Sequence, residues 1–192
     1  MQVKLILQKG NPMRKIAVLI NDGVEEMECF TTVDLCRHGG IDATTISVTG
    51  NEVINGAHDT RFFTDTLISE VDFNAFDGIV FPGGPGTDAL GEVPGVRELA
   101  KQFLDDGRLL AAICAVPGML SETGLFKDRT ATGYPGLTPE GGANWTKEQI
   151  ERDGNLITGK GPGASAYFAI EIVRYLQGDE AAEQVYDYIQ LS

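Results

Sequence analysis

The segment "LLAAICAVPG", residues 109–118, joins an apolar stretch to a sharp turn. Its first five residues are all apolar, and such a run is typical of a strand that is covered on both faces. Cys114 follows directly, and Pro117 lies where prolines favour the first turn of a helix. The segment therefore predicts a strand, a turn and a helix, with a cysteine at the turn.

The rest of the chain repeats this alternation of short apolar runs and amphipathic stretches. The predicted strands are 15–20, 42–48, 77–84, 108–114 and 155–159. Residues 52–63 contain the turn signal Asn55-Gly56, which predicts a small β excursion there. Helices are predicted at 24–40, 93–107, 164–177 and 180–190, and a short one is predicted to run from Pro117-Gly118 to about Gly124. Residues 133–145 are predicted to form a loop. Apolar strands that alternate with helices predict an α/β fold with a parallel sheet covered on both faces.

Length and charge limit the domain organisation and the partners. The 192 residues, 42% of them hydrophobic, suffice for one domain, which we place at 13–192. Residues 1–12 are equally well explained as a start-site extension outside the fold or as an ordinary N-terminal segment, and they do not read as a signal peptide. With 28 acidic and 15 basic residues, the net charge of -13 disfavours nucleic acid and anionic membranes as partners.

Cysteine and histidine usage disfavours a metal centre. Three cysteines without tight spacing match neither a disulfide framework nor a zinc site, and two histidines are too few for most histidine-rich metal sites. We therefore expect no metal and a reducing, cytoplasmic location. Cys29 and Cys36 fall outside the predicted buried stripe of their helix, where packing against a neighbouring helix or subunit explains them. His38 is expected to be structural, and His58 has no assignable partner.

Glu28 is the first candidate for chemistry. On a helical wheel, Val24, Met27, Thr31 and Leu35 form one apolar stripe, and Glu28 falls inside it. Burial would raise the pKa of this carboxyl group, which suits a group that moves a proton near neutral pH. The alternative is that Glu28 lies near the helix start and reaches solvent or cap donors.

The glycines after the predicted strand 77–84 are the second candidate. Residues 84–89 match a G-x-G-x-x-A pattern, but that fingerprint belongs after the first strand, and Pro85 lacks an N–H for a phosphate. We therefore expect no dinucleotide and no other cofactor. The favoured interpretation is a turn whose Gly83 and Gly84 amides face an anion, and the alternative is a loop that needs glycine for positive φ alone.

Cys114 is the third candidate, since a thiol at a helix N-terminus is favoured as thiolate by the free amides. The predicted geometry resembles a nucleophile elbow, in which the Ala115 amide points toward a bound oxyanion. A cysteine that ends an apolar strand is more often a core residue, but Glu28 and the glycine turn project from the same edge of the sheet. The segment 160–168 needs no chemistry, since Pro162 near a helix start and Ser165 as a cap explain it.

Four motifs together resemble the ThiJ/PfpI superfamily, and most closely its DJ-one branch of parkinsonism-associated protein deglycases and their bacterial relatives. They are "GVEEMEC", "VFPGG", "AAICA" and "GKGPGASAYFAIEIV", and the resemblance covers residues 15 to about 190. It implies a flavodoxin-like, doubly wound sandwich, usually a homodimer. It also implies that Cys114 is the reactive cysteine and Glu28 the carboxylate hydrogen-bonded to it, with oxyanion amides from Gly83, Gly84 and Ala115.

Two positions depart from the family pattern. Many relatives carry a histidine next to the elbow cysteine, where this chain has Ala115, and the DJ-one branch usually has a histidine where this chain has Tyr134. The sequence thus offers no Cys–His pair, which disfavours an amidase or peptidase unless a neighbouring chain supplies a base. Tyr134 remains a candidate hydrogen-bond donor to substrate.

The leading hypothesis is a cofactor-free enzyme that acts on small α-oxoaldehydes or glycation adducts, as the resemblance implies. The Cys114 thiolate would add to the aldehyde, and Glu28 would relay protons. The rival is a non-enzymatic stress protein, a chaperone or a redox sensor, in which Glu28 stabilises oxidised Cys114.

Overall fold

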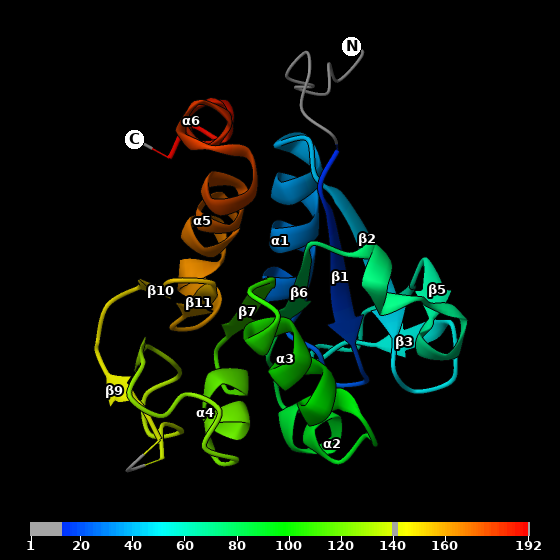
Figure 1. Cartoon of the computed structure of the whole chain (residues 1–192). Coiled ribbons are helices and arrows are strands. Elements are labelled where there is room, and N and C mark those ends of the chain that lie inside the picture. The colour runs from blue at the N-terminus through cyan, green and yellow to red at the C-terminus, as the bar shows by residue number, and fades with distance from the viewer. Residues whose placement is uncertain (1–12, 140–141, 192) are drawn as a thin grey trace.

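The computed structural model describes residues 13–139 and 142–191, which form a seven-stranded sheet between two layers of helices (Figure 1). The strands of this sheet are β1 (Lys15–Ile20), β2 (Asp42–Ser47), β5 (Thr66–Leu67), β6 (Gly78–Phe81), β7 (Leu109–Ile113), β10 (Ile150–Asp153) and β11 (Leu156–Gly159). Their spatial order is β10-β11-β7-β6-β1-β2-β5, and β10 alone runs antiparallel to its neighbour.

Two short pairs of strands and six α-helices complete the described chain. The pairs are β3 (Val53–Asn55) with β4 (Arg61–Phe63), and β8 (Thr130–Ala131) with β9 (Asn144–Trp145). The helices are α1 (Glu26–His38), α2 (Thr87–Gly91), α3 (Val96–Asp105), α4 (Val116–Ser121), α5 (Ser165–Gln177) and α6 (Asp179–Tyr188). None of these helices is long and apolar enough to span a membrane.

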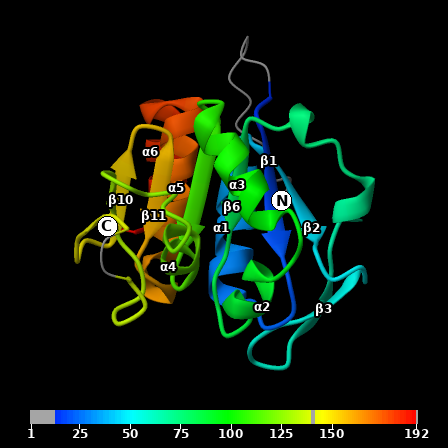
Figure 2. The ribbon, with the colours of Figure 1, turned by 60° about the horizontal axis from the view of Figure 1, so that its bottom comes forward.

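Side chains alternate between two cores because successive residues of a strand point to opposite faces. Ile16 and Val18 of β1 face a core formed with α1, α5 and α6, whereas Ala17 and Leu19 face a core formed with α2, α3 and α4. Figure 2 shows these two helical layers on opposite sides of the sheet. Burial on both faces explains why the parallel strands read as continuous apolar runs, and the predicted α/β fold is confirmed.

The sheet reverses its strand order between β1 and β6. The chain passes from β1 outward to β2 and β5, and then returns to the other side of β1 with β6 and β7. The loops after β1 and β6 therefore leave in opposite directions and open a crevice at the carboxyl ends of the strands. Cys114 follows β7, the next strand along this edge, so the fold itself brings the predicted candidates together.

Most element predictions are confirmed, with shorter bounds. The predicted strand 77–84 ends at Phe81, because the following Pro-Gly-Gly forms the turn, and the Asn55-Gly56 region forms the predicted small hairpin. Periodicity did not predict α2 or the short strands β5, β8, β9 and β10, and β9 lies at the end of the predicted loop 133–145. The predicted boundary between residues 12 and 13 involves a segment that lies outside the described residues.

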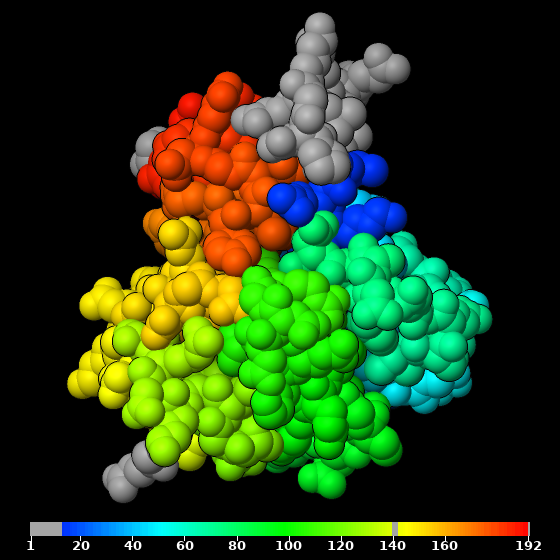
Figure 3. Space-filling model, in the orientation of Figure 1, coloured from blue at the N-terminus to red at the C-terminus, as the bar shows by residue number. Residues whose placement is uncertain are grey.

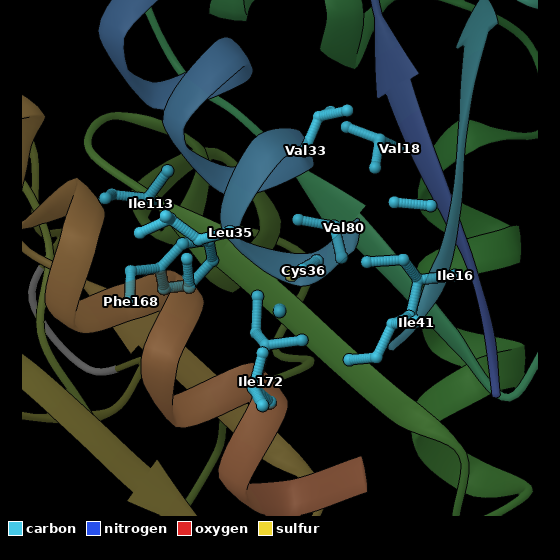
Figure 4. Packing of buried hydrophobic residues seen from close by; sticks show 14 of the residues in the cluster. Ile16, Val18, Val33, Leu35, Cys36, Ile41, Val80, Ile113, Phe168 and Ile172 are labelled. Carbon is cyan, nitrogen blue, oxygen red and sulfur yellow. The ribbon is translucent and has the colours of Figure 1, made fainter. Parts of the chain in front are cut away.

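The predicted buried stripe of the first helix is wrong in detail. Met27 is 56% exposed, whereas Cys29 and Cys36, expected off the stripe, are completely buried. The reason is that α1 is covered by the sheet on one side and by α5 on another, so its buried arc is wider than one stripe. Figure 4 shows Leu35 and Cys36 of α1 between the sheet and the α5 residue Phe168.

Candidate active site

Cys114 forms a strained elbow between β7 and α4. Its φ of 67° lies in the left-handed region, which is unusual for a residue with a side chain. Two hydrogen bonds hold the backbone there: its N–H donates to the Gly159 carbonyl at 2.9 Å, and its carbonyl accepts from the Tyr134 N–H at 2.7 Å. The side chain is held at the carboxyl edge of the sheet and keeps 7% of its surface exposed.

Glu28 lies on the first turn of α1 with no exposed surface. Its Oε2 accepts a hydrogen bond from the Gly83 N–H at 2.7 Å, and its Oε1 is buried without a partner at ordinary hydrogen-bond distance in the described residues. Burial raises the pKa of this carboxyl to about 7, and the Gly83 N–H and the nearby Cys114 thiol oppose this rise only in part. The expected burial of Glu28 and the rise in its pKa are therefore confirmed, whereas its role in moving a proton stays a prediction.

The thiol and the carboxyl compete for one negative charge. Burial raises the pKa of Cys114 to about 12, and the negative charge of Glu28 adds to this rise. Backbone N–H groups of Ala115 and Gly84 act in the opposite sense by hydrogen-bonding to the sulfur. A charge on either group raises the pKa of the other, so Cys114 loses its proton more easily when Glu28 is protonated than when Glu28 is ionised.

Gly83 and Gly84 leave the room that this arrangement needs. A Cβ on Gly83 would lie 2.7 Å from the Cβ of Cys114 and 3.1 Å from Oε2 of Glu28. Gly84 has a φ of 117°, and a Cβ on it would come within 2.5 Å of the backbone nitrogen of Glu25. The positive φ of Gly84 and the lack of room for a side chain at both positions thus explain why this turn needs glycine, and they leave the backbone amides close to Glu28 and Cys114.

One oxyanion assignment changes, because the Gly83 N–H already donates to Glu28. The backbone N–H groups of Gly84 and Ala115 act on the Cys114 sulfur and oppose the rise in its pKa, and an oxyanion formed on a carbonyl bound to this sulfur would lie beside them. The Gly83 N–H therefore positions Glu28, and the assignment of the Gly84 and Ala115 amides to an oxyanion stays a prediction.

Tyr134 is anchored beside the elbow by its backbone. Its ring is 45% exposed and lies against Gly161, where an added Cβ would meet Cδ2 at 3.3 Å. The residue that stands in place of the family's usual histidine therefore borders the site and packs on the segment after β11.

Neither histidine forms a pair with Cys114 in the described structure. The His38 ring stacks on Tyr188 of α6 with centroids 3.7 Å apart, as suits the structural role expected for it. His58 Nδ1 lies 2.9 Å from Glu26 Oε2, and this contact raises the pKa of His58. His38 thus contacts Tyr188 and His58 contacts Glu26, so the described chain by itself offers no Cys–His dyad.

The other two cysteines are buried core residues. All three cysteines are free, and burial raises the pKa of Cys29 to about 12 and that of Cys36 still further. Burial also raises the pKa of Cys114 to about 12, so the pKa alone does not distinguish it; Cys114 differs from the other two cysteines by its partial exposure and by the Glu28 carboxyl and backbone amides beside it.

Glu25, Glu26 and His58 form one cluster that could hold a metal ion, with ligand atoms all within 4.8 Å of one another. Although burial opposes it, hydrogen bonding with His58 lowers the pKa of Glu26 to about 2. The contact with Glu26 favours the protonated form of His58, and a metal ligated by Nδ1 of His58 would have to displace that proton and this contact.

The segment 160–168 directly follows a residue that holds the elbow. The preceding Gly159 carbonyl holds the Cys114 N–H, and the Ser165 hydroxyl donates to the Pro162 carbonyl at 2.7 Å. The predicted helix cap at Ser165 is therefore wrong, since its oxygen receives no N–H from the helix. The run of glycines around Pro162 was the available signal that the backbone approaches another segment closely here.

Comparison with known proteins agrees with this geometry. Residues 14–175 match the model of the DJ-1/PfpI family. The chain belongs to the DJ-1/PfpI family. The protein dj-1beta of Drosophila melanogaster is 35% identical over 172 residues, which cover 88% of this chain and 92% of that protein.

Other family members agree in sequence and in structure. A Caenorhabditis elegans protein named glutathione-independent glyoxalase DJR-1.2 is 32% identical over 167 residues, which cover 86% of this chain and 89% of that one. The crystal structure of Drosophila melanogaster DJ-1beta superposes with a TM-score of 0.88 at 32% identity, over 93% of this chain and 98% of that chain. The flavodoxin-like fold expected from the resemblance is thereby confirmed.

The raised pKa of Glu28 predicts a pH-dependent stability. The folded state binds a proton between about pH 4.5 and 7 that the unfolded chain releases, so this contribution is fully present below pH 4.5 and is lost as the pH rises through 7. Its size is about 3 kcal/mol, from 1.36 kcal/mol per pKa unit. Urea unfolding should show that the wild type loses about this much stability relative to Glu28→Gln between pH 4.5 and 7.5.

Glu92→Gln is the matched control, since it makes the same change on an exposed side chain. Its stability difference from the wild type should stay constant over this pH range. A constant difference for Glu28→Gln as well would contradict the proton-holding role of Glu28.

Proposed function

We propose that this DJ-1/PfpI protein is a cofactor-free, cysteine-dependent enzyme that converts small α-oxoaldehydes into α-hydroxy acids. The observation that carries the proposal is the buried Glu28 carboxyl, with a pKa near 7, beside a strained Cys114 whose sulfur is met by two backbone amides. This arrangement provides a nucleophile, a proton carrier and oxyanion donors within one small site.

The chemistry starts with the Cys114 thiolate, which adds to the aldehyde carbon of methylglyoxal to form a hemithioacetal. The amides of Gly84 and Ala115 hold the resulting oxyanion, which takes the proton of Glu28. The Glu28 carboxylate then removes the proton from the former aldehyde carbon and returns it to the neighbouring carbon through an enediol, which gives a lactoyl thioester. Water hydrolyses the thioester to lactate and frees Cys114, so that methylglyoxal and one water yield lactic acid.

Glycation adducts of amines are further candidate substrates of the same thiol, since they also carry an electrophilic carbon. The free state of all three cysteines supports a cytoplasmic location, where thiols stay reduced. An amidase or peptidase reaction is less well supported, because His38 and His58 are engaged with Tyr188 and Glu26.

Lactate formation from methylglyoxal tests the enzyme proposal. We expect Cys114→Ser to lower kcat/KM by at least about 10³-fold and Glu28→Gln by about 10²-fold, because proton transfer by a positioned group contributes 10²–10⁴-fold. Enzymatic assay of L- and D-lactate measures the rate. Cys36→Ala, which removes a buried core thiol, should form lactate at the wild-type rate. Equal rates for the wild type, Cys114→Ser and Glu28→Gln would show that this mechanism is wrong.

A redox-sensing role is the second candidate, and the surroundings of the sulfur favour it. The amides that would hold an oxyanion could equally hold the oxygens of a Cys114 sulfinate, with a protonated Glu28 as a further donor. Two molecules of hydrogen peroxide would convert the thiol to the sulfinic acid and release two of water.

Intact-mass and peptide analysis after mild peroxide treatment tests this candidate. We expect a stable gain of two oxygen atoms on Cys114, while the fully buried Cys29 and Cys36 stay reduced. The gain should be absent in Glu28→Gln, because the variant cannot place a carboxylic acid against the sulfinate. Oxidation of the variant to the same extent would rule out stabilisation by Glu28.

We also propose a homodimer, with the exposed apolar face of α1 as the interface. Met27 and Phe30 lie one turn apart on α1 and are 56% and 43% exposed. Phe30 makes an edge contact with Phe62 of β4 at a centroid distance of 4.8 Å, which joins the helix and the hairpin into one apolar face. Such a face on a chain of net charge -13 is typical of a protein interface.

Light scattering on the eluted protein tests the dimer. We expect twice the chain mass for the wild type and a single-chain mass for Met27→Asp and Phe30→Asp, because each buries a charge in the interface. Tyr188→Asp on α6, where the side chain is also exposed, should remain dimeric. A monomeric wild type would contradict the proposal, as would dimers in both α1 variants.

A further inference from the structure

A groove of about 490 Å³ lies beside the elbow, between the segment after β8 and the segment after β11. Its lining residues are Tyr134, Pro135, Gln149, Lys160, Gly161, Pro162, Gly163 and Ala164. Figure 3 shows the two parts of the chain, yellow-green and yellow, lying side by side on the surface. The mechanism proposed above uses none of this space.

Both walls of the groove are tied to the backbone of Cys114. One wall starts at Gly159, whose carbonyl accepts the Cys114 N–H at 2.9 Å, and continues directly into Lys160. The other wall starts at Tyr134, whose N–H donates to the Cys114 carbonyl at 2.7 Å. Since a residue spans at most about 3.6 Å, the groove opens within a residue or two of the elbow. A substrate whose carbonyl is bound at Cys114 can therefore extend a chain of a few atoms into it.

Among the described residues that line this groove, Lys160 is the only charged one. Its Nζ donates to the backbone carbonyl of Lys147 at 2.9 Å, so a neutral carbonyl holds the ammonium in place without cancelling its charge. An ammonium group has three donors, which leaves two for a ligand. The groove thus presents a positive charge on a chain whose net charge is -13.

A second groove, of about 290 Å³, lies on the other side of the same loop and has the opposite charge. Ala115 and Met119 line it together with the acidic residues Asp88 and Glu122, and it is closed by residues 136–139. Arg97 pairs with Glu122 at 3.5 Å, but Asp88 forms no ion pair in the described residues, so an anionic substituent is disfavoured on this side and attracted to the side of Lys160.

We propose that the groove of Lys160 is a subsite for the anionic arm of the substrate, and that the preferred substrates are α-oxoaldehydes that bear a carboxylate. One ammonium matches a single carboxylate charge, and no arginine lines the groove to bind a phosphate in bidentate fashion. Tyr134 and Pro162 provide apolar surface for the methylene groups between the carbonyl and the carboxylate. Lys160 is then a specificity-determining residue. The proposal rests on the oxoaldehyde activity proposed above.

The test compares kcat/KM for 4,5-dioxopentanoate and 5,6-dioxohexanoate with that for their uncharged carboxamides. We expect kcat/KM of the wild type for the better-fitting carboxylate to exceed that for its carboxamide by about three- to fivefold, which is the range of a partly exposed ion pair. Lys160→Gln should reduce this ratio to about one, and Lys160→Arg should retain it. Lys147→Gln is the matched control, because it removes a neighbouring positive charge and keeps the backbone carbonyl that holds Lys160.

Binding of the unreactive ketones 4-oxopentanoate and 5-oxohexanoate separates a failure of the subsite from a failure of the enzyme proposal. We expect the better-fitting acid to shift the amide resonances of Tyr134 and Gly161 in the wild type and Lys147→Gln, with at least threefold weaker affinity in Lys160→Gln. Turnover of neither acid nor amide, with this binding intact, would refute the enzyme proposal alone. A charge preference unchanged in Lys160→Gln, or absent in the wild type, would overturn the subsite.

Discussion

The site depends on a reciprocal clamp between the first turn of α1 and the glycine turn after β6. The Gly83 N–H donates to the Glu28 carboxyl at 2.7 Å, and the Gly83 carbonyl accepts the Glu25 N–H at 2.8 Å. One glycine thus fixes both the start of the helix and the carboxyl that the helix buries. A side chain at position 83 would collide with Cys114, so the clamp also sets how closely the thiol approaches.

This clamp determines the electrostatics of the centre. Desolvation raises the pKa of both the thiol and the carboxyl, and the charge of one makes ionisation of the other more costly. Backbone amides provide the compensating donors without adding a charged side chain. In the proposed mechanism, a carboxyl whose pKa is raised to about 7 takes the place of the histidine that this chain lacks at the elbow, and it suits carbonyl addition and enolisation better than amide cleavage, which must protonate a poor leaving group.

Much of the architecture could be predicted from the sequence because it follows from local patterns. The apolar run of β1 and the strand–turn–helix at residues 109–118 required only periodicity and a proline to interpret. The wheel for α1 failed on Met27 and Cys36, since a single stripe cannot represent a helix that packs against both a sheet and another helix. Short elements such as α2 and β10 carry too few residues for a periodic signal.

The sequence by itself determined the α/β order, the candidate residues Cys114 and Glu28, and the absence of a histidine beside the elbow. Only the tertiary structure decided that the Gly83 amide serves Glu28 and that the left-handed Cys114 is held by Gly159 and Tyr134. It also decided that Lys160 borders a groove next to the thiol. The physical reason is that hydrogen bonds and charges act between groups close in space, whereas periodicity reports only which face of its own element a residue occupies.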